Sequence, residues 1–467
     1  MKKTFFLFLL LSSFVYVLGS QAAITTPEDI ILADSTYHVE DYAIPSFIQF
    51  LAAKEAARAN FSEENVLALN QKIAALQPYQ MPYDVVVNIN GDPTTQMAFA
   101  WFTNDRMTEG QVQLTPITDL SLLQTVFDTA TNVMTCEATP TAVKKIRYAI
   151  GLSGIPAATG LPMSTKYKFT SHKVIAEGLT PNTTYAYRVG VDGYWSEVAT
   201  FTTAPLNDPE ASEDFTFVYM TDSHIQDQKY VDVARQAAIA AARNTPEAKF
   251  CVFPGDFVET GTVGNSEWEW ERWFEEAMRP VIKQMPIVPT DGNHDDSSNQ
   301  NYSYHFNTDN QFKENAKVKP QFDGITYSFM YGDVLFLVYS LQDYWKGAYS
   351  LTNGTSTYLT NDVGNWFREQ VAAHPEAKWR VALVHKNIFS GSSHQEDEET
   401  PLFRATMLPI MKECEIDLML QGHDHCYEVI GPVDPDTRTP ILNAIEDLEP
   451  TVLSASRNKG GTFTVND

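Results

Sequence analysis

The chain has 467 residues, of which 43% are hydrophobic and 12% aromatic, so it is long enough for two or three globular domains. Its formal net charge of −26 argues against nucleic acid as the main partner, because a polyanion would be repelled at long range. Small phosphorylated substrates are not excluded, since bound metal cations can dominate the field inside a site.

The first 23 residues are typical of a secretory signal peptide. Lys2 and Lys3 precede an apolar core from Phe5 to Leu18, and small residues follow as far as Ala23. The apolar core is short for a membrane span, and the alternative interpretation is an uncleaved anchor. We therefore expect an exported protein, periplasmic or extracellular, without stable membrane insertion.

Two regions of different periodicity follow. Residues 24–78 form a helical lead-in, with helices predicted over 45–59 and 63–76. Residues 79–204 change to alternating apolar and polar positions separated by turn residues, which predicts an antiparallel β-sandwich. The stretch Leu-Thr-Pro-Asn-Thr-Thr-Tyr-Ala-Tyr-Arg-Val at 179–189 resembles a fibronectin type III module, in which a Tyr packs at a corner. This region has no cluster of ligand or nucleophile residues, so we expect it to serve packing, orientation or specificity.

Residues 205–213 are a polar linker, and strands alternate with helices in the remaining segment, 214–467. A hairpin is predicted across 325–341. Helices are predicted over 231–243, 361–372 and 402–414, and another is predicted from the Ser-Glu-Trp-Glu capping box at 266–269 to near Pro280. Burial is expected for Trp268, Trp270 and Trp273 rather than a place on a site rim.

The four cysteines have no close spacing such as C-x-x-C. Cys251 and Cys414 lie in or beside apolar runs and are expected to be small core residues rather than part of a disulfide framework. Cys426 follows a histidine and could approach a site, although we expect it to pack.

Asp, Asn and His cluster five times where an apolar, strand-like run ends. Five of the ten histidines fall in these clusters. In open α/β sheets this carboxyl edge is where ligands bind. The clusters are Asp222-Ser223-His224, Gly255-Asp256, Gly292-Asn293-His294-Asp295, His385, and Gly422-His423-Asp424-His425.

These residue types suit divalent first-row metals, which accept mixed carboxylate, amide and imidazole ligands. In an extended segment residues i and i+2 point the same way, so Asp222 with His224, and His423 with His425, can each direct two groups at one centre. Two cations sharing a carboxylate can activate a water and stabilise an in-line displacement at phosphorus. The sequence has no nucleophile elbow and no phosphate-cradling Gly-rich loop that would support a competing mechanism.

The ordered clusters resemble the five motifs of the calcineurin-like metallophosphoesterases, and the sandwich before them resembles the amino-terminal domain of purple acid phosphatases. The resemblance covers roughly residues 80–467. It implies an α/β fold, namely a four-layer α/β/β/α metallophosphatase domain preceded by the all-β, fibronectin type III-like sandwich. It also implies two divalent or mixed-valence metal ions drawn from Fe, Zn or Mn.

The same resemblance implies a role for each motif residue. One metal would be held by Asp222, His224, Asp256 and His425. The other would be held by Asp256, Asn293, His385 and His423, with Asp256 bridging. His294 would contact the phosphate or protonate the leaving group, and Asp295 would orient a neighbouring ligand.

Two positions depart from the purple acid phosphatase pattern. The tyrosine ligand expected three residues after the bridging aspartate is Glu259, and the glycine expected two residues after the first aspartate is His224. A two-metal site without the tyrosinate colour is therefore predicted. His394 lies where plant members hold a substrate-contacting histidine, but it is followed by Gln395 instead of a second histidine. A surface loop position for His394 is the alternative.

The segment Gly-Gly-Thr-Phe-Thr-Val at 460–465 is predicted to begin a strand, and similar proteins continue with further strands. The catalytic domain is therefore expected either to be cut short at its C-terminus or to close unusually. The function that follows is a secreted dinuclear-metal phosphatase that hydrolyses phosphoric monoesters of small substrates. A phosphodiesterase or nucleotide hydrolase using the same site is the closest alternative, and a non-catalytic binding protein with a retained metal site is the other.

Overall fold

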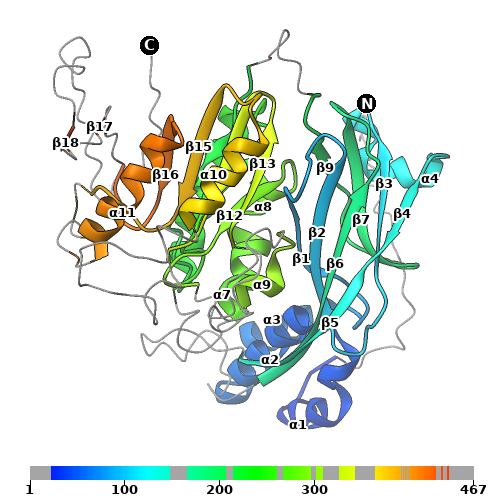
Figure 1. Cartoon of the computed structure of the whole chain (residues 1–467). Helices are drawn as coiled ribbons and strands as arrows, with labels where there is room; N and C mark the ends of the chain where they lie inside the picture. The colour runs from blue at the N-terminus through cyan, green and yellow to red at the C-terminus, as the bar shows by residue number, and fades with distance from the viewer. Residues whose placement is uncertain are drawn as a thin grey trace, which may run out of the picture.

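The computed structural model describes most of the chain and contains two β-rich parts that share one continuous core (Figure 1). The described residues are 23–147, 166–206, 214–259, 267–295, 301–308, 325–341, 363–390, 392, 394, 397, 399–427, 433–434 and 439–440. Residues 1–22 of the predicted signal peptide, the strand predicted at 460–465 and the Ser266 position of the capping box lie outside them.

The helical lead-in contains α1 (Pro27–Thr36), α2 (Ile44–Ala59) and α3 (Glu63–Ala74), with a short 3₁₀ turn η1 (Val39–Asp41). Thr26 and Asp29 form a reciprocal capping box at the start of α1, and the Ser62 hydroxyl caps α3 by accepting from Asn65 N. The helices predicted from Ala, Glu and Lys content are confirmed.

The first β-rich part has two antiparallel sheets, as the alternating pattern predicts. One contains β1 (Tyr83–Asn88), β2 (Gln96–Asn104), β5 (Thr139–Arg147) and β6 (Lys166–Glu177). The other contains β3 (Gln111–Pro116), β4 (Met134–Glu137), β7 (Thr184–Val191), β8 (Tyr194–Trp195) and β9 (Ala199–Thr202), with η2 (Leu120–Thr125) and α4 (Val126–Thr129) between β3 and β4.

A tyrosine corner is present where the sequence predicted one. The Tyr185 hydroxyl accepts a hydrogen bond from Thr180 N at 2.9 Å, and the Tyr185 ring is buried and stacks on Phe201. The contact closes the turn before β7, which is the local feature that the fibronectin type III resemblance implied.

The second part has two sheets facing each other. Strands β10 (Val218–Tyr219), β11 (Cys251–Pro254) and β12 (Ile287–Thr290) are parallel. The other sheet has the order β13 (Tyr327–Tyr331), β14 (Val334–Val338), β15 (Trp379–Val384) and β16 (Leu418–Gln421), in which β13 and β14 form the predicted hairpin and the later strands run parallel. A two-stranded sheet joins β17 (Val433–Asp434) and β18 (Thr439–Pro440).

Helices cover the outer face of each sheet and complete the four predicted layers. The layer against β10–β12 contains α5 (Gln228–Asn244), α7 (Glu267–Arg272), the π-helical turn η3 (Trp273–Ala277), α8 (Arg279–Ile282) and α9 (Asn301–His305). The layer against β13–β16 contains α10 (Gly364–Ala373) and α11 (Glu399–Glu413). Trp268, Trp270 and Trp273 are buried, as expected.

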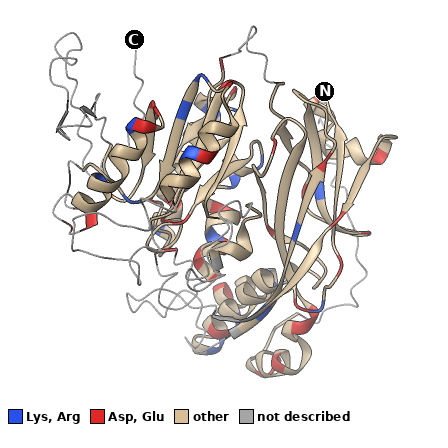
Figure 2. Ribbon diagram, viewed as in Figure 1, with Lys and Arg blue, Asp and Glu red and all other residues tan. Residues whose placement is uncertain are grey.

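The two parts are joined through the sheet itself. Strand β1 pairs in parallel with β12, with Asn88 opposite Ile287, so one seven-stranded sheet runs β10-β11-β12-β1-β2-β6-β5. Of the linker predicted at 205–213, residues 207–213 lie outside the described residues. Figure 2 shows Asp and Glu distributed over both parts, consistent with the acidic composition.

Cys251 and Cys414 are buried and unbridged, as predicted, whereas Cys426 is exposed and the packing role expected for it is wrong. Its position after the last strand-end histidine leaves it beyond the apolar layer. Among the described residues, none of the helices combines the length and the apolar character needed to span a bilayer.

Candidate metal centre

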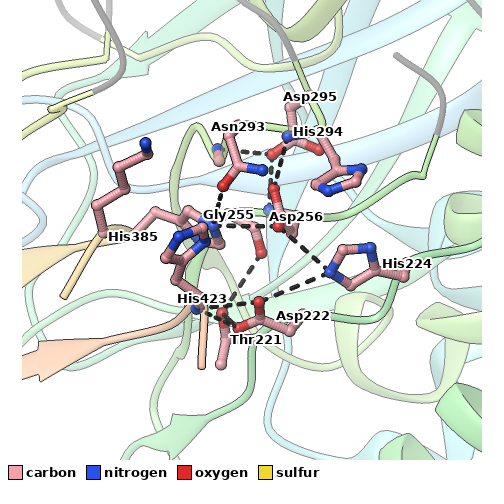
Figure 3. Close-up of polar contacts among 12 residues, drawn as sticks. Thr221, Asp222, His224, Gly255, Asp256, Asn293, His294, Asp295, His385 and His423 are labelled. Carbon is pink, nitrogen blue, oxygen red and sulfur yellow. Dashed lines mark hydrogen bonds and ion pairs between the residues drawn. The ribbon is translucent and has the colours of Figure 1, made fainter. Parts of the chain in front are cut away.

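The five sequence clusters converge at one edge shared by the two sheets of the second part (Figure 3). Parallel strands place the loops after β10, β11 and β12 at one edge, and the loops after β15 and β16 leave the facing sheet at the same place. Two contacts join the sheets directly. His423 N donates to both carboxylate oxygens of Asp222 at 3.0 Å, and His385 Nδ1 donates to the Pro254 carbonyl at 2.8 Å.

Five of the seven predicted metal ligands have positive backbone φ angles. Non-glycine residues rarely adopt this left-handed region, and each such residue costs on the order of 1–3 kcal/mol unless its surroundings impose it. The strained conformation turns each side chain away from its strand direction and towards the common centre. The angles are 54° for Asp222, 43° for His224, 52° for Asp256, 78° for His423 and 52° for His425.

Glycines allow the loops to approach each other closely. A Cβ on Gly292 would lie 2.2 Å from Asp256 Oδ1 and 2.3 Å from Asp256 N. A Cβ on Gly422 would lie 2.6 Å from Asp222 Oδ2 and 2.5 Å from the Thr221 hydroxyl oxygen. Because any side chain there would displace a carboxylate of the centre, glycine is required at both positions by space rather than by backbone angle.

One set of ligand atoms comes from Asp222, His224, Asp256 and His425, and these atoms lie within 4.8 Å of one another. His224 Nε2 is 3.2 Å from Asp256 Oδ2 and 3.7 Å from Asp222 Oδ1, while His425 Nε2 is 3.3 Å from the same Asp222 oxygen. All four predicted ligands of the first metal are therefore together.

A second set comes from Asp256, His385 and His423, which are buried and also lie within 4.8 Å. His385 Nε2 is 3.1 Å from Asp256 Oδ2 and 3.1 Å from the side-chain oxygen of Asn293. Asp256 Oδ2 therefore faces both sets, which is the position that a bridging carboxylate requires.

The unpaired atoms of this centre fit a pair of cations. Within the described part of the chain, buried His224 Nε2 and Asp256 Oδ2 have no partner with hydrogen-bond geometry, although both point into the cluster. Buried polar atoms without partners are costly, and metal coordination is a way to satisfy them. Carboxylate oxygen, amide oxygen and imidazole nitrogen together suit first-row divalent ions.

Burial and mutual contact shift the pKa values of this cluster. Burial disfavours the charged form of His224, but the neighbouring carboxylates of Asp222, Asp256 and Glu259 raise its pKa to about 12. Burial likewise opposes protonation of His385, while the Asp256 charge raises its pKa to about 9. Without a cation, these protons neutralise the carboxylates. Metal binding must release them, because only neutral imidazole nitrogen is a ligand.

Asp295 lies beneath the centre and holds two loops together. Its buried carboxylate accepts hydrogen bonds from the backbone N–H groups of Asp256, Phe257, Val258 and Gly292 at 2.8–3.3 Å. Burial and the Asp256 charge raise the pKa of Asp295 to about 8, while the bonds from Gly292 and Val258 oppose that shift. The residue thus fixes the backbone of the shared aspartate and is outside both ligand sets.

His294 lies beside the centre on the same loop as Asn293. Its backbone N–H donates to Asp256 Oδ1 at 2.8 Å, and its ring Nδ1 donates to the Glu259 carbonyl at 2.7 Å. A carbonyl can only accept, so Nδ1 carries the proton and Nε2 is available to a ligand. The ring packs edge-on against His224 with centroids 4.6 Å apart.

His394 also lies at the centre. Its ring stacks on His423 with centroids 3.8 Å apart, and its Nδ1 is 2.6 Å from the Asp397 carboxylate. His394 therefore contacts His423, a predicted metal ligand, which the surface-loop alternative did not anticipate. Asp397 was not identified from the sequence, although a His and an Asp three residues apart offered a weak signal.

Glu259 is the other residue whose role the sequence did not reveal. Its carboxylate contacts His224 Nδ1 at 2.6 Å, and its carbonyl accepts from His294. Thr221 was missed as well, and its hydroxyl donates to Asp222 Oδ2 at 2.7 Å. Glu259 follows Asp256 by three positions and Thr221 directly precedes Asp222. Nothing in either residue type indicates that its side chain contacts the centre.

Comparison with known families matches this arrangement. Residues 215–427 match the calcineurin-like phosphoesterase family, and residues 82–203 match the purple acid phosphatase N-terminal domain. The phosphoesterase match contains all ten predicted site residues.

Relatives with known sequences cover part of the chain. An uncharacterized protein of Mycobacterium tuberculosis is 26% identical over 285 residues, covering 56% of this chain and 52% of that protein. Purple acid phosphatase 23 of Arabidopsis thaliana is 25% identical over 287 residues, covering 58% of this chain and 59% of that protein. The matched region therefore spans between half and three fifths of these relatives.

Among solved structures, the purple acid phosphatase PPD1 from yellow lupin (Lupinus luteus) seeds aligns with a TM-score of 0.54 at 15% identity, covering 76% of this chain and 60% of that one. At that identity the likeness concerns the fold. The chain therefore contains a calcineurin-like phosphoesterase domain over residues 215–427, preceded by a purple acid phosphatase N-terminal domain over residues 82–203.

Proposed function

We propose that the protein is an exported phosphatase that hydrolyses small phosphoric monoesters at a centre of two metal ions. The observation that carries the proposal is the shared position of Asp256, whose Oδ2 lies 3.2 Å from His224 Nε2 and 3.1 Å from His385 Nε2. When bound, two cations would supply Lewis-acid stabilisation of the phosphate oxygens and would lower the pKa of a bound water.

The ligand assignment rests on the two sets of side chains. Asp222, His224, Asp256 and His425 would hold one ion. The other would be held by Asp256, His385 and His423 together with Asn293, whose side-chain oxygen lies beside His385. Fe, Zn and Mn all suit this donor set, and Glu259 in place of a tyrosine predicts a metal-loaded protein without a strong visible band.

His294 is proposed as the general acid. Because Nδ1 is held by the Glu259 carbonyl, the imidazolium form would present an Nε2 proton to the leaving-group oxygen. His394 is proposed to contact the substrate phosphate, with the Asp397 carboxylate fixing its ring through Nδ1. Asp295 is proposed to position the Asp256 backbone without touching substrate.

The test is hydrolysis of an aryl phosphate monoester by purified protein reconstituted with Fe, Zn or Mn, alongside Asp256→Asn. The proposal expects activity in the parent and a loss of at least 100-fold in the variant, since removing the shared charge weakens both metal positions. A bis-aryl diester is measured in parallel. Faster hydrolysis of the diester would replace the monoesterase proposal with a phosphodiesterase. Absence of activity on both substrates in metal-loaded parent would overturn the enzymatic proposal.

A further inference from the structure

A second cluster of ligand-type side chains is buried where the first β-rich part meets the helix layer. Asp84 of β1, Glu267 of α7 and His305 of α9 are each at most 2% exposed, and one ligand atom from each lies within 4.8 Å of the others. Each residue comes from a different element, so only the folded chain assembles the cluster. It is separate from the metal centre and shares no residue with it.

Asp84 has the burial and the unpaired oxygens expected of a metal ligand. Both carboxylate oxygens are buried and have no hydrogen-bond partner among the described residues. Asp84 has a φ of 53°, and the pairing of β1 with β2 shifts register between Tyr83 and Val86. This irregularity directs an aspartate into the interior from a strand that is buried along its whole length, where an unpaired carboxylate costs several kcal/mol.

His305 completes a donor set of two carboxylates and an imidazole. Its Nε2 lies 2.7 Å from Glu267 Oε1, and its ring is enclosed by Trp270, Phe274 and Phe102 at centroid distances of 4.5–5.0 Å. The aromatic wall excludes water and fixes the ring orientation. Mixed oxygen and imidazole donors suit divalent first-row ions, and zinc is commonly held by this combination.

The surroundings carry an excess of negative charge. Glu267, Glu271 and Glu275 recur every fourth residue from α7 into η3, and all three act on the Asp84 carboxylate. Arg279 acts on it in the opposite sense, and Arg279 is already paired with Glu197 at 2.7 Å. Two buried carboxylates with a divalent cation would form a neutral unit, which removes the penalty of isolated charges.

We propose that Asp84, Glu267 and His305 form a structural site for one divalent cation such as Zn²⁺. The bound ion would link β1 to α7 and α9. Such an ion would lock the continuous sheet at the junction of β1 and β12 against the helix layer. It would act on the stability of the junction between the two parts and would not contact substrate.

The test is metal stoichiometry. Chelator-treated parent protein is loaded with Zn²⁺, desalted and measured for zinc per chain by mass spectrometry, beside Asp84→Asn and His305→Gln. The expected result is one zinc fewer per chain in each variant than in the parent, with the remaining zinc and the aryl phosphatase activity kept. The same loss of one zinc is expected when Asp84→Asn is introduced into Asp256→Asn.

Glu271→Gln is the matched control, because Glu271 is a buried glutamate of the same helix face that lies outside the three-residue cluster. It should retain the parent zinc count. Equal zinc in parent, Asp84→Asn and His305→Gln would overturn the proposal, as would an equal loss in Glu271→Gln. If Asp84→Asn does not fold, His305→Gln decides, and a zinc-induced rise in melting temperature of the Asp256→Asn protein that His305→Gln abolishes is a second readout.

Discussion

The Glu259 carboxylate lies 2.6 Å from Nδ1 of His224, so the two positions that depart from the purple acid phosphatase pattern are in contact. With Nδ1 held by the carboxylate, Nε2 faces Asp256 and Asp222. Carboxylate partners of this kind fix the ring of a ligating histidine and raise its basicity. We propose that a carboxylate paired with an additional histidine takes the place of the direct tyrosine ligand.

Glu259→Gln should weaken metal binding and activity by about 10- to 100-fold, because the neutral amide is a poorer acceptor for the His224 ring N–H. Zinc retention against a graded chelator and kcat/KM on an aryl phosphate would measure the effect. Glu376→Gln is the control, since Glu376 makes a similar contact with His374 at 3.1 Å on the exposed surface. Equal behaviour of the two variants would contradict the role assigned to Glu259.

Gly292→Ala should abolish metal binding at the shared carboxylate. The new methyl group would meet Asp256 Oδ1 at 2.2 Å and must displace it. Gly178→Ala is a suitable comparison, because a methyl there meets nothing within 4 Å although φ is +72°. The comparison variant should lose about 1 kcal/mol of stability from backbone strain and keep its metal. Normal metal content in Gly292→Ala would show that the loops move apart freely.

Asp295→Asn should lower the free energy of unfolding by about 2–4 kcal/mol, because an amide cannot accept from all four backbone N–H groups and brings its own donors towards them. Urea denaturation of the metal-free proteins is the appropriate measurement, since it separates loop stability from metal affinity. Asp333→Asn, at a buried hairpin aspartate paired with Lys378 at 3.4 Å, should cost about 1 kcal/mol or less. A smaller loss in Asp295→Asn than in this control would refute the anchoring role.

His172 should make the first β-rich part less stable in acid. It stacks on Trp101 and its Nε2 bonds Thr103 at 2.8 Å, and burial lowers its pKa to about 4. The unfolded chain protonates at its ordinary pKa near 6.5, so unfolding takes up a proton between these values and stability falls as the pH drops from about 6.5 to 4.

The expected loss between pH 7.5 and pH 4.5 attributable to His172 is about 2–3 kcal/mol. Denaturant titrations of the parent and His172→Phe at both pH values measure it, because the carboxylates that titrate in the same window are common to both proteins. The parent should lose more stability than the variant on acidification. Equal losses would mean that His172 is protonated in the folded state.

Local sequence pattern determined the secondary structure and the chemistry of this protein. Period-two alternation in β2 and β7, and apolar runs ending in Asp or His, report on nearest neighbours along the chain, so the strands and the ligand types could be recognised directly. The parallel order of strands then requires the clusters to meet at one sheet edge. All seven predicted metal ligands are brought together for that reason.

Tertiary structure decided which side chains support that chemistry. The contact of Glu259 with His224, the four backbone bonds to Asp295 and the stacking of His394 on His423 join loops whose relative position no local periodicity encodes. The same holds for Asp84 and His305, which are 221 positions apart and meet only because β1 pairs with β12 and α9 packs on that sheet. Such contacts depend on long-range closure of the chain, whereas residue spacing records only what neighbouring residues do.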